Sequence, residues 1–304
     1  MSLRGEMLRV AARHLIKRGT RPEIDIATRR QRLLAYERWV PAAPRGTATI
    51  DKALGGIAAI RVATPASRDD RHVLFLHGGG YVSGSPALYR HLTWRIAAAT
   101  EAQLAAVHYR LAPEHPFPAA LEDAAAAWQG LLAEGADPAR CVVIGDSAGG
   151  GLALALMLKL RDGGGMLPAA VVALSPWTDL AITGASCRLN AAADPMLNAD
   201  DLRPLAARYL GGADPRHPYA SPLYGDLRGL PPALLHVGSD EILRDDSVRM
   251  AERLRDAGGT VALEIWPRMP HVWHAFVPYL PEAGRAIARI GAFVRQRAVG
   301  TADG

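Results

Sequence analysis

Short runs of apolar residues without polar alternation recur along the chain from residue 73 onward. Such runs are typical of strands that are buried on both faces, as in a parallel sheet. They are expected at 73–76, 104–108, 141–144, 169–174, 233–237 and 261–266. Helical stretches alternate with them, for example at 119–132, and a final helix is expected at 283–296. Strands that alternate with helices predict an α/β fold, with a mostly parallel central sheet flanked by helices.

The first 45 residues follow a different pattern. Residues 1–40 predict two helices that are broken near 19–22, and apolar residues recur at helical spacing at Leu8, Ala11, Ala12 and Leu15. Residues 1–45 contain 11 Lys/Arg and 4 Asp/Glu, a balance of +7, whereas the remaining 259 residues contain 24 and 26, a balance of −2. A basic segment can bind nucleic acid or an anionic membrane. We favour helices that pack on their apolar side and expose arginine to solvent.

The connection from about residue 179 to residue 232 is too long for a simple crossover. Asn198 is expected to cap a helix over 199–210, which Gly211 and Gly212 would end. We therefore predict an insertion that lies over the carboxyl edge of the sheet.

Length and composition fit one large α/β domain. The chain has 304 residues, of which 49% are hydrophobic and 21% charged, and this excludes a disordered or collagenous protein. No apolar run approaches the ~18 residues of a transmembrane helix. Charged residues also interrupt the N-terminus, so no signal peptide is expected. Two cysteines, Cys141 and Cys187, cannot build a disulfide framework, so free thiols and a cytoplasmic location are expected.

The segment 145–149 (Gly-Asp-Ser-Ala-Gly) fits the pattern G-x-S-x-G. It lies between a predicted strand and a predicted helix, which is the setting of a nucleophile elbow. Such a turn exposes the Ser147 hydroxyl at a helix N-terminus, where the helix dipole favours developing negative charge. The alternative is a glycine-rich turn that binds phosphate. The chain has no G-x-G-x-x-G and no P-loop lysine to support that alternative.

A second glycine cluster follows the strand at 73–76, in the run His77-Gly78-Gly79-Gly80. Consecutive glycines allow backbone N–H groups to point into a cavity without obstruction by side chains. Together with the N–H of Ala148, they would form an oxyanion hole.

A serine nucleophile needs a base, and the base needs an orienting carboxylate. In this architecture the chain order is Ser, acid, His. Asp240 follows the strand at 233–237 and is the predicted acid, while Asp245 and Asp246 are expected to cap the next helix. His271 follows the last strand and is favoured as the base over His274. His236 lies inside a strand and is expected in the core, and no His/Cys/Asp spacing suggests a metal site.

These motifs resemble those of the hormone-sensitive-lipase-like (family IV) carboxylesterases among the α/β-hydrolases. The resemblance extends over most of residues 70–280. It includes the HGGG run at 77–80, the run YRLAPEHPFPAA at 109–120, GDSAGG at 145–150, SPW at 175–177 and MPH at 269–271. The family often has proline after the triad aspartate, whereas this chain has Glu241 after Asp240.

The resemblance implies a Ser147–Asp240–His271 triad, with Gly79, Gly80 and Ala148 as oxyanion donors. Gly78 could replace one of the loop glycines. In addition, His77, Gly78 and Asp146 are predicted to contact the substrate. Residues 1–45 would form an N-terminal helical cap, and residues 46–304 the α/β-hydrolase catalytic domain, with a cap insertion at about 180–215.

The implied activity is hydrolysis of short- to medium-chain acyl esters without a cofactor. Acyl transfer or amide hydrolysis by the same triad is an alternative. A non-catalytic member of the fold that binds a small ligand is another. The expected partner is a small ester, with no nucleic acid and no stable membrane insertion. The sequence is compatible with a monomer and with a homo-oligomer.

Overall fold

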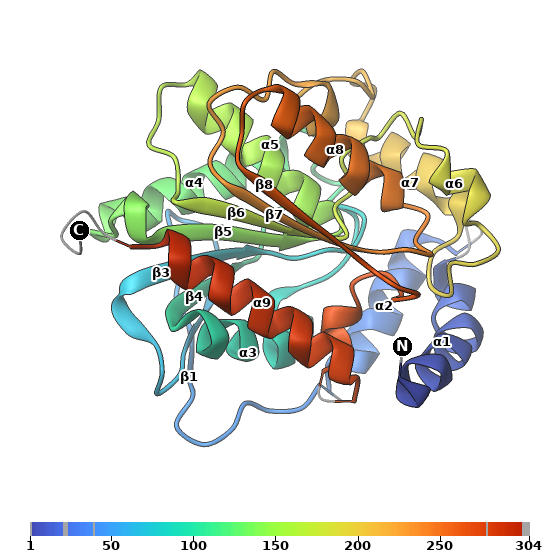
Figure 1. The fold of residues 1–304 in the computed structure, drawn as a ribbon, viewed down its shortest axis with the longest axis horizontal. Coiled ribbons are helices and arrows are strands. Elements are labelled where there is room, and N and C mark those ends of the chain that lie inside the picture. The colour runs from blue at the N-terminus through green and yellow to red at the C-terminus, as the bar shows by residue number, and fades with distance from the viewer. Residues whose placement is uncertain (1, 21–23, 39, 278, 300–304) are drawn as a thin grey trace.

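Eight strands form one sheet in the computed structural model, which describes residues 2–20, 24–38, 40–277 and 279–299 (Figure 1). The strand order is β1-β2-β4-β3-β5-β6-β7-β8. The strands are β1 (Ala48–Asp51), β2 (Ala59–Ala63), β3 (Arg68–Leu76), β4 (Ala102–Val107), β5 (Cys141–Asp146), β6 (Ala170–Leu174), β7 (Ala233–Gly238) and β8 (Val261–Trp266). Pairing is antiparallel at β1–β2 and β2–β4 and parallel elsewhere. The predicted mostly parallel sheet and its six predicted strands are confirmed.

Helices cover both faces of this sheet (Figure 1). One face is covered by α3 (Arg90–Thr100) and α9 (Pro281–Arg297), and the other by α4 (Ala119–Ala133), α5 (Ala148–Asp162) and α8 (Arg244–Asp256). Alternate residues of a strand enter opposite layers, as in β5, where Val143 packs on one side and Val142 and Ile144 on the other. This double burial explains why the strands are continuous apolar runs.

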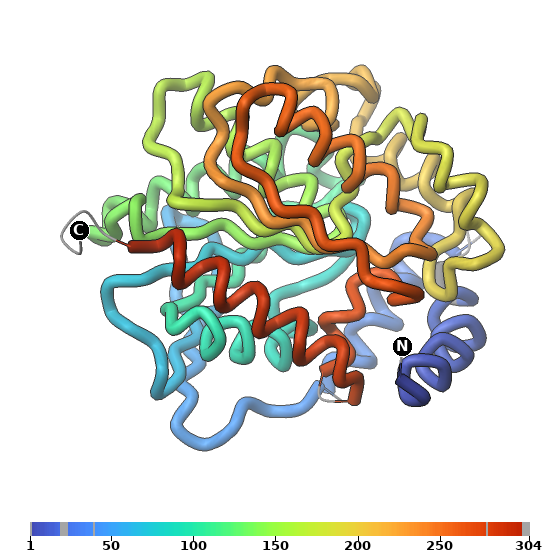
Figure 2. Tube along the Cα trace, viewed as in Figure 1, coloured from blue at the N-terminus to red at the C-terminus, as the bar shows by residue number. Residues whose placement is uncertain are grey.

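Two helical segments that are far apart in sequence meet at the carboxyl ends of the strands (Figures 1 and 2). The N-terminal segment contains α1 (Leu3–Leu15), the short helix η1 (Lys17–Thr20) and α2 (Ile26–Glu37). The insertion after β6 contains α6 (Ser186–Leu189) and α7 (Ala199–Leu210). Arg29 of α2 binds both carboxylate oxygens of Asp201 in α7, at 3.0 and 2.8 Å. The N-terminal segment therefore packs on the insertion.

The helix predicted over 199–210 is confirmed, but its predicted cap is wrong. Gly211 ends α7 with a left-handed backbone at φ +58°. At the other end, the Asn198 side chain makes no capping hydrogen bond. It donates instead to the carbonyl of Lys17, at 2.8 Å. A contact between segments has thus replaced the local cap.

The orientation of α1 differs from the sequence expectation. Ala12 is buried as expected, but Ala11 and Leu15 are exposed. Three cations of this segment instead donate to backbone carbonyls of residues 191–194: Arg9, Arg13 and Lys17. The expectation that arginines face solvent is wrong for Arg9, whose side chain is only 11% exposed. The physical reason is that the carbonyls of this turn need hydrogen-bond donors, and the cations supply them.

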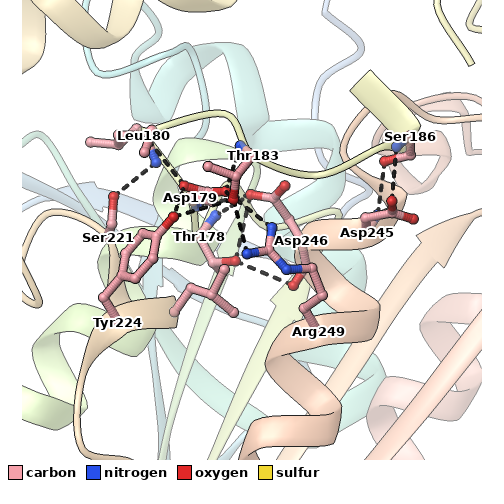
Figure 3. Close-up of polar contacts among 12 residues, drawn as sticks. Thr178, Asp179, Leu180, Thr183, Ser186, Ser221, Tyr224, Asp245, Asp246 and Arg249 are labelled. Carbon is pink, nitrogen blue, oxygen red and sulfur yellow. Dashed lines mark hydrogen bonds and ion pairs between the residues drawn. The ribbon is translucent and has the colours of Figure 1, made fainter. Parts of the chain in front are cut away.

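Two buried carboxylates hold the base of the insertion (Figure 3). Asp246, in the first turn of α8, accepts hydrogen bonds from the backbone N–H groups of Thr178 and Asp179 at 2.8 and 2.9 Å. Asp179 in turn accepts from Thr183 and from Arg249. Burial, together with the nearby charge of Asp179, raises the pKa of Asp246 to about 8. The carboxylates of this first turn thus bind the insertion, where the sequence suggested helix caps.

Asp245, the residue before Asp246, also binds the insertion. Its Oδ2 accepts a hydrogen bond from the backbone N–H of Ser186, at the start of α6, at 2.8 Å (Figure 3).

Both cysteines are free thiols. None of the helices in the described ranges has the length and apolarity needed to cross a bilayer.

Candidate active site

The predicted nucleophile elbow is present at the carboxyl end of β5. Ser147 joins β5 to α5 with φ +53° and ψ −122°, a conformation that residues other than glycine rarely adopt. The flanking glycines are required by close packing. A Cβ at Gly145 would lie 2.1 Å from the carbonyl oxygen of Gly149, and a Cβ at Gly149 would lie 2.1 Å from that of Leu76. The sequence thus forces Ser147 to the tip of a tight turn.

Ser147 meets His271 and an acidic residue in one hydrogen-bonded line. The Ser147 Oγ lies 2.9 Å from Nε2 of His271, and Nδ1 of the same ring lies 2.7 Å from Oε2 of Glu241. Since a carboxylate only accepts, Nδ1 carries the hydrogen and Nε2 is free to accept from the serine hydroxyl. The three side chains come from loops that follow β5, β7 and β8, whose carboxyl ends share one edge of the sheet.

The predicted acid, Asp240, is wrong for this geometry, because the carboxylate that contacts His271 is that of Glu241. Oδ2 of Asp240 lies 2.9 Å from Nη2 of Arg9, and its Oδ1 accepts from the Ser239 hydroxyl at 2.8 Å. The two neighbouring carboxylates thus have different partners, and of the two it is Glu241 that contacts His271. One feature of the sequence is consistent with this, because the proline that often follows the family's aspartate is absent after Asp240.

Glu241 is fully buried and held from several sides. Its Oε1 accepts hydrogen bonds from the Ser175 hydroxyl at 2.7 Å and from the backbone N–H of Gly238 at 2.5 Å. Burial by itself lowers the pKa of His271, but the hydrogen bond and the negative charge of Glu241 outweigh it. The net result is a pKa of His271 above its ordinary value of 6.5. Glu241 therefore stabilises the protonated imidazolium.

The insertion fixes the loop that contains Glu241. The Asn190 side chain donates to the carbonyls of Ser239 and Glu241 at 3.1 and 2.8 Å. From the same insertion, Asp194 accepts from the backbone N–H of Ile242 at 2.9 Å. Sequence reasoning did not single out Asn190 or Asp194, because nothing local to them indicates this distant contact. The position of the acid thus depends on the insertion.

The glycine loop after β3 leaves backbone donors available. Gly79 and Gly80 have φ values of +124° and +64°, which glycine adopts without strain. Within the described ranges, no acceptor is found for the N–H groups of Gly79, Gly80 or Ala148. The N–H of Gly78 is already donated to Oδ1 of Asp146 at 2.9 Å, so Gly78 does not fit this role. Leu205 of α7 lies over the loop, 3.2 Å from where a Cβ of Gly80 would be.

His77, Gly78 and Asp146 do not fit the predicted role of contacting the substrate, because the His77 and Asp146 side chains are buried and the N–H of Gly78 is already donated to Asp146. Nδ1 of His77 donates to the carbonyl of Gly78 at 2.8 Å, and its ring stacks on Tyr109. Burial lowers the pKa of His77 to about 4. Oδ2 of Asp146 accepts from the Tyr89 hydroxyl at 2.8 Å, and burial raises the pKa of this carboxyl to about 7. These residues position the glycine loop from behind.

His274, the rival base, lies away from Ser147. Its Nε2 is 3.1 Å from Nδ1 of His236, and both rings are fully buried. Burial, and to a smaller degree the neighbouring histidines, keep the pKa of His274 well below its ordinary value. The prediction that His236 is a core residue is confirmed. In the part of the chain that the structure describes, no group of three His, Cys, Asp or Glu side chains could hold a metal ion.

Comparisons with known proteins agree with this fold. A family model described as the alpha/beta hydrolase fold matches residues 73–275. A crystal structure of an esterase from the bacterial hormone-sensitive lipase family is 43% identical, with a TM-score of 0.93 over 98% of this chain and 99% of that chain. The chain belongs to the hormone-sensitive-lipase-like branch of the α/β-hydrolases. This hydrolase is also similar to EstE5, solved after soaking with p-nitrophenyl butyrate, at 41% identity and a TM-score of 0.93 over 99% of this chain and 100% of that one.

Two curated relatives of the hydrolase come from bacteria. An acetyl-hydrolase of Streptomyces hygroscopicus is 52% identical over 231 residues, which cover 76% of this chain and 77% of the relative. An esterase of Acinetobacter venetianus is 36% identical over 241 residues, which cover 79% of each chain. Both matches extend over most of the hydrolase.

Proposed function

We propose that this hydrolase cleaves carboxylic esters through an acyl-enzyme, with Ser147 as nucleophile, His271 as general base and Glu241 as orienting acid. The observation that supports this most directly is the line of hydrogen bonds from Ser147 through His271 to Glu241, at 2.9 and 2.7 Å. The relatives named above as esterase and acetyl-hydrolase support the ester as substrate class.

In the first half of the reaction, Nε2 of His271 takes the hydroxyl proton as Ser147 Oγ attacks the ester carbonyl. The carbonyl π electrons move onto oxygen, and this oxyanion accepts hydrogen bonds from the N–H groups of Gly79, Gly80 and Ala148. Removal of one such donor typically costs about 3–4 kcal/mol of barrier. Collapse of this tetrahedral intermediate re-forms the carbonyl and breaks the bond to the alcohol oxygen, which takes its proton from the imidazolium that Glu241 stabilises.

In the second half, water replaces the alcohol. His271 takes a proton from this water as its oxygen attacks the acyl carbonyl, and the same N–H groups hold the second oxyanion. Collapse of the tetrahedral intermediate breaks the bond to Ser147 Oγ, which regains its proton from His271. Each half returns the histidine to its neutral form, and the chemistry requires no cofactor.

The cap is proposed to limit the acyl chain to short and medium lengths. Helices α1 and α2, together with α6 and α7 of the insertion, lie at the carboxyl edge of the sheet (Figure 1), and Leu205 of α7 lies next to the glycine loop. A closed pocket discriminates each misfit methylene by about 1–3 kcal/mol. Butyrate and hexanoate esters should therefore be preferred over palmitate.

Cytoplasmic location remains a prediction that rests on the two free thiols.

Hydrolysis of p-nitrophenyl butyrate tests the activity, and the Ser147→Ala variant tests the nucleophile. We expect turnover by the parent protein and a loss of at least about 10⁴-fold in kcat in the variant, with an unchanged melting profile as the fold control. An organophosphorus ester should label Ser147 alone in the parent, as located by mass spectrometry. Release of p-nitrophenol by the variant at the parent rate would contradict the assignment.

The same assay separates the alternatives. An acyltransferase would give butyrate esters of an added alcohol in preference to butyric acid, and an amide hydrolase would cleave the matching anilide faster than the ester. A ligand-binding member of the fold would release no p-nitrophenol and show no labelling at Ser147. Each of these outcomes would replace the proposed esterase activity.

A further inference from the structure

The outward face of α1 is apolar. Leu3, Met7 and Val10 are 79%, 66% and 59% exposed. Their spacing of four and three residues places them on one side of the helix, whereas Gly5 and Ala12 are its buried residues. A surface helix normally turns its apolar side to the protein core. We call these three side chains the outer face of α1.

The inward contacts of α1 keep this face turned to solvent. Arg9 donates to the carbonyls of Arg268 and Ala193 and pairs with Asp240, while Arg13 donates to carbonyls of the turn at 191–194. Directly after the helix, Lys17 of η1 donates to the same turn. If the helix rolled to bury its apolar side, these charge-assisted bonds would be lost. The exposed face is therefore a consequence of how the helix is anchored.

Exposed apolar side chains are concentrated in this segment. Of the twelve large apolar side chains that are exposed in the described ranges, six lie within residues 3–36: Leu3, Met7, Val10, Leu15, Leu34 and Tyr36. Large apolar side chains that gather in one exposed region mark interaction sites. The question is which partner fits the surface.

Charge identifies the partner. Residues 1–45 have a balance of +7 against −2 for the rest of the chain. Arg4, next to Leu3 in α1, and Arg18, in the following η1, are both exposed. An apolar strip bordered by cations fits the boundary between headgroups and acyl chains of an anionic lipid layer. A symmetric contact with a second copy would instead bring two strongly basic segments together.

We propose that the outer face of α1 docks on anionic lipid surfaces. Leu3, Met7 and Val10 enter the layer to the depth of the headgroup boundary, and Arg4 and Arg18 contact lipid phosphates. The helix lies on the surface and does not span it. Because Arg9 of the same helix pairs with Asp240, next to Glu241, docking brings the lipid layer beside the proposed active site. This inference goes beyond the proposed function and does not depend on it.

Co-sedimentation with vesicles tests the docking. The Ser147→Ala protein is mixed with vesicles of equal parts phosphatidylglycerol and phosphatidylcholine, or of phosphatidylcholine alone. We expect binding to the anionic vesicles that weakens with added salt, and little binding to the neutral ones. In the same background, Met7→Ser with Val10→Ser should lower the partition coefficient about tenfold or more.

A matched pair of substitutions controls for lost apolar surface. Ile50 and Met166 are 60% and 57% exposed and lie outside the N-terminal segment, so Ile50→Ser with Met166→Ser should bind vesicles as the parent does. Arg4→Gln with Arg18→Gln should reduce binding and its salt dependence. Melting curves show that each variant is folded. Catalysis is not a readout, so a failed esterase assay leaves this test intact.

Three outcomes would overturn the proposal. The first is no binding of the parent to anionic vesicles. The second is an equal loss of binding in the two serine pairs. In the third, light scattering finds a dimer that Met7→Ser with Val10→Ser dissociates while vesicle binding stays unchanged, and the outer face of α1 would then be an interface between copies.

Discussion

Two neighbouring carboxylates, Asp240 and Glu241, have different surroundings. Asp240 has a side chain that is 21% exposed and pairs with Arg9 of the N-terminal segment. Glu241 is fully buried between Ser175 and His271. A buried carboxylate is stable only when its oxygens are paired, and Glu241 meets this condition through its two oxygens. The acid of the site is therefore defined by its contacts rather than by its place after the strand.

Glu241→Gln should lower kcat by about 10³–10⁴-fold, because an amide supports the wrong tautomer of His271. It should also move the acid limb of the kcat/KM profile to lower pH. The sign follows from the pKa of His271, which Glu241 raises above 6.5 and burial alone would lower. Since the base works only when neutral, activity of the parent is lost as pH falls through this raised pKa.

Asp240→Asn is the matched control for Glu241→Gln, because it neutralises the adjacent carboxylate. We expect kcat within a few-fold of the parent and an unmoved acid limb. Steady-state kinetics with p-nitrophenyl butyrate across the pH range measure both quantities. An inactive Asp240→Asn beside an active Glu241→Gln would restore the acid that the sequence indicated.

The residues of the site differ in how far the sequence could predict them. Ser147 was predictable because the elbow offers one hydroxyl at the tip of its turn. His271 was favoured over His274 because it lies nearer the end of the last strand. Gly79 and Gly80 were predictable because a left-handed backbone requires glycine. The choice between Asp240 and Glu241 was not, since both follow the same strand and only tertiary contacts orient them.

Between elements, the pair Asp179 and Asp246 joins the base of the insertion to α8 (Figure 3). An acid whose folded pKa is raised retains a proton that the unfolded chain releases. Asp246, with a folded pKa of about 8 against 3.8, therefore makes the protein less stable as pH rises between these two values. The connection is strongest while Asp246 is protonated.

Asp246→Asn should remove this loss of stability at high pH, because a neutral amide keeps an oxygen that accepts hydrogen bonds from the N–H groups of Thr178 and Asp179. The difference in melting temperature between the variant and the parent should therefore grow in favour of the variant, by a few degrees, as pH rises from about 5 to about 9. Thermal unfolding at several pH values measures this. A constant difference between the two proteins over that range would contradict it.

Asp245→Asn provides the control with the opposite sign. Burial tends to raise the pKa of Asp245, but the hydrogen bond and charge of Arg244, with the N–H of Ser186, lower it overall. Its carboxylate thus stabilises the fold above the unfolded pKa, and this stabilisation is lost as pH falls. The substitution should therefore destabilise the protein at neutral and alkaline pH.

Element boundaries were easier to predict than the contacts between elements. The end of the helix over 199–210 follows from Gly211, because glycine adopts the left-handed backbone that ends a helix. The Asn198 side chain has two competing partners, the end of its own helix and the carbonyl of Lys17, and the distant one prevails. Nothing in the residues around Asn198 indicates that Lys17 is near.

At the scale of the whole molecule, the N-terminal segment contacts both the insertion and the loop after β7 that contains Asp240 and Glu241. Arg29 pairs with Asp201, whose side chain is 5% exposed, and Arg9 pairs with Asp240. These contacts connect residues that are more than 170 positions apart, so the sequence pattern could not reveal them. They also explain why cations here face inward, against the usual expectation for arginine.

Deletion of residues 1–40 should therefore lower stability and change acyl-chain preference. Loss of Arg29 leaves Asp201 as a buried carboxylate without this partner, at a cost of roughly 3–5 kcal/mol. Thermal unfolding and kcat/KM across acyl lengths measure the two effects. Arg9→Gln with Arg29→Gln is the milder variant in case the deletion fails to fold. Unchanged melting and unchanged preference in both would show that the segment is dispensable.

The backbone of Ser147 makes stability and activity compete at a single position. With φ +53° and ψ −122°, any residue with a Cβ is strained there, at a typical cost of about 1–3 kcal/mol. Glycine adopts this conformation freely. Ser147→Gly should thus melt at a higher temperature than Ser147→Ala, although both lack the hydroxyl. Selection for thermal robustness alone would favour an inert protein at this position, and only a requirement for turnover would keep the serine.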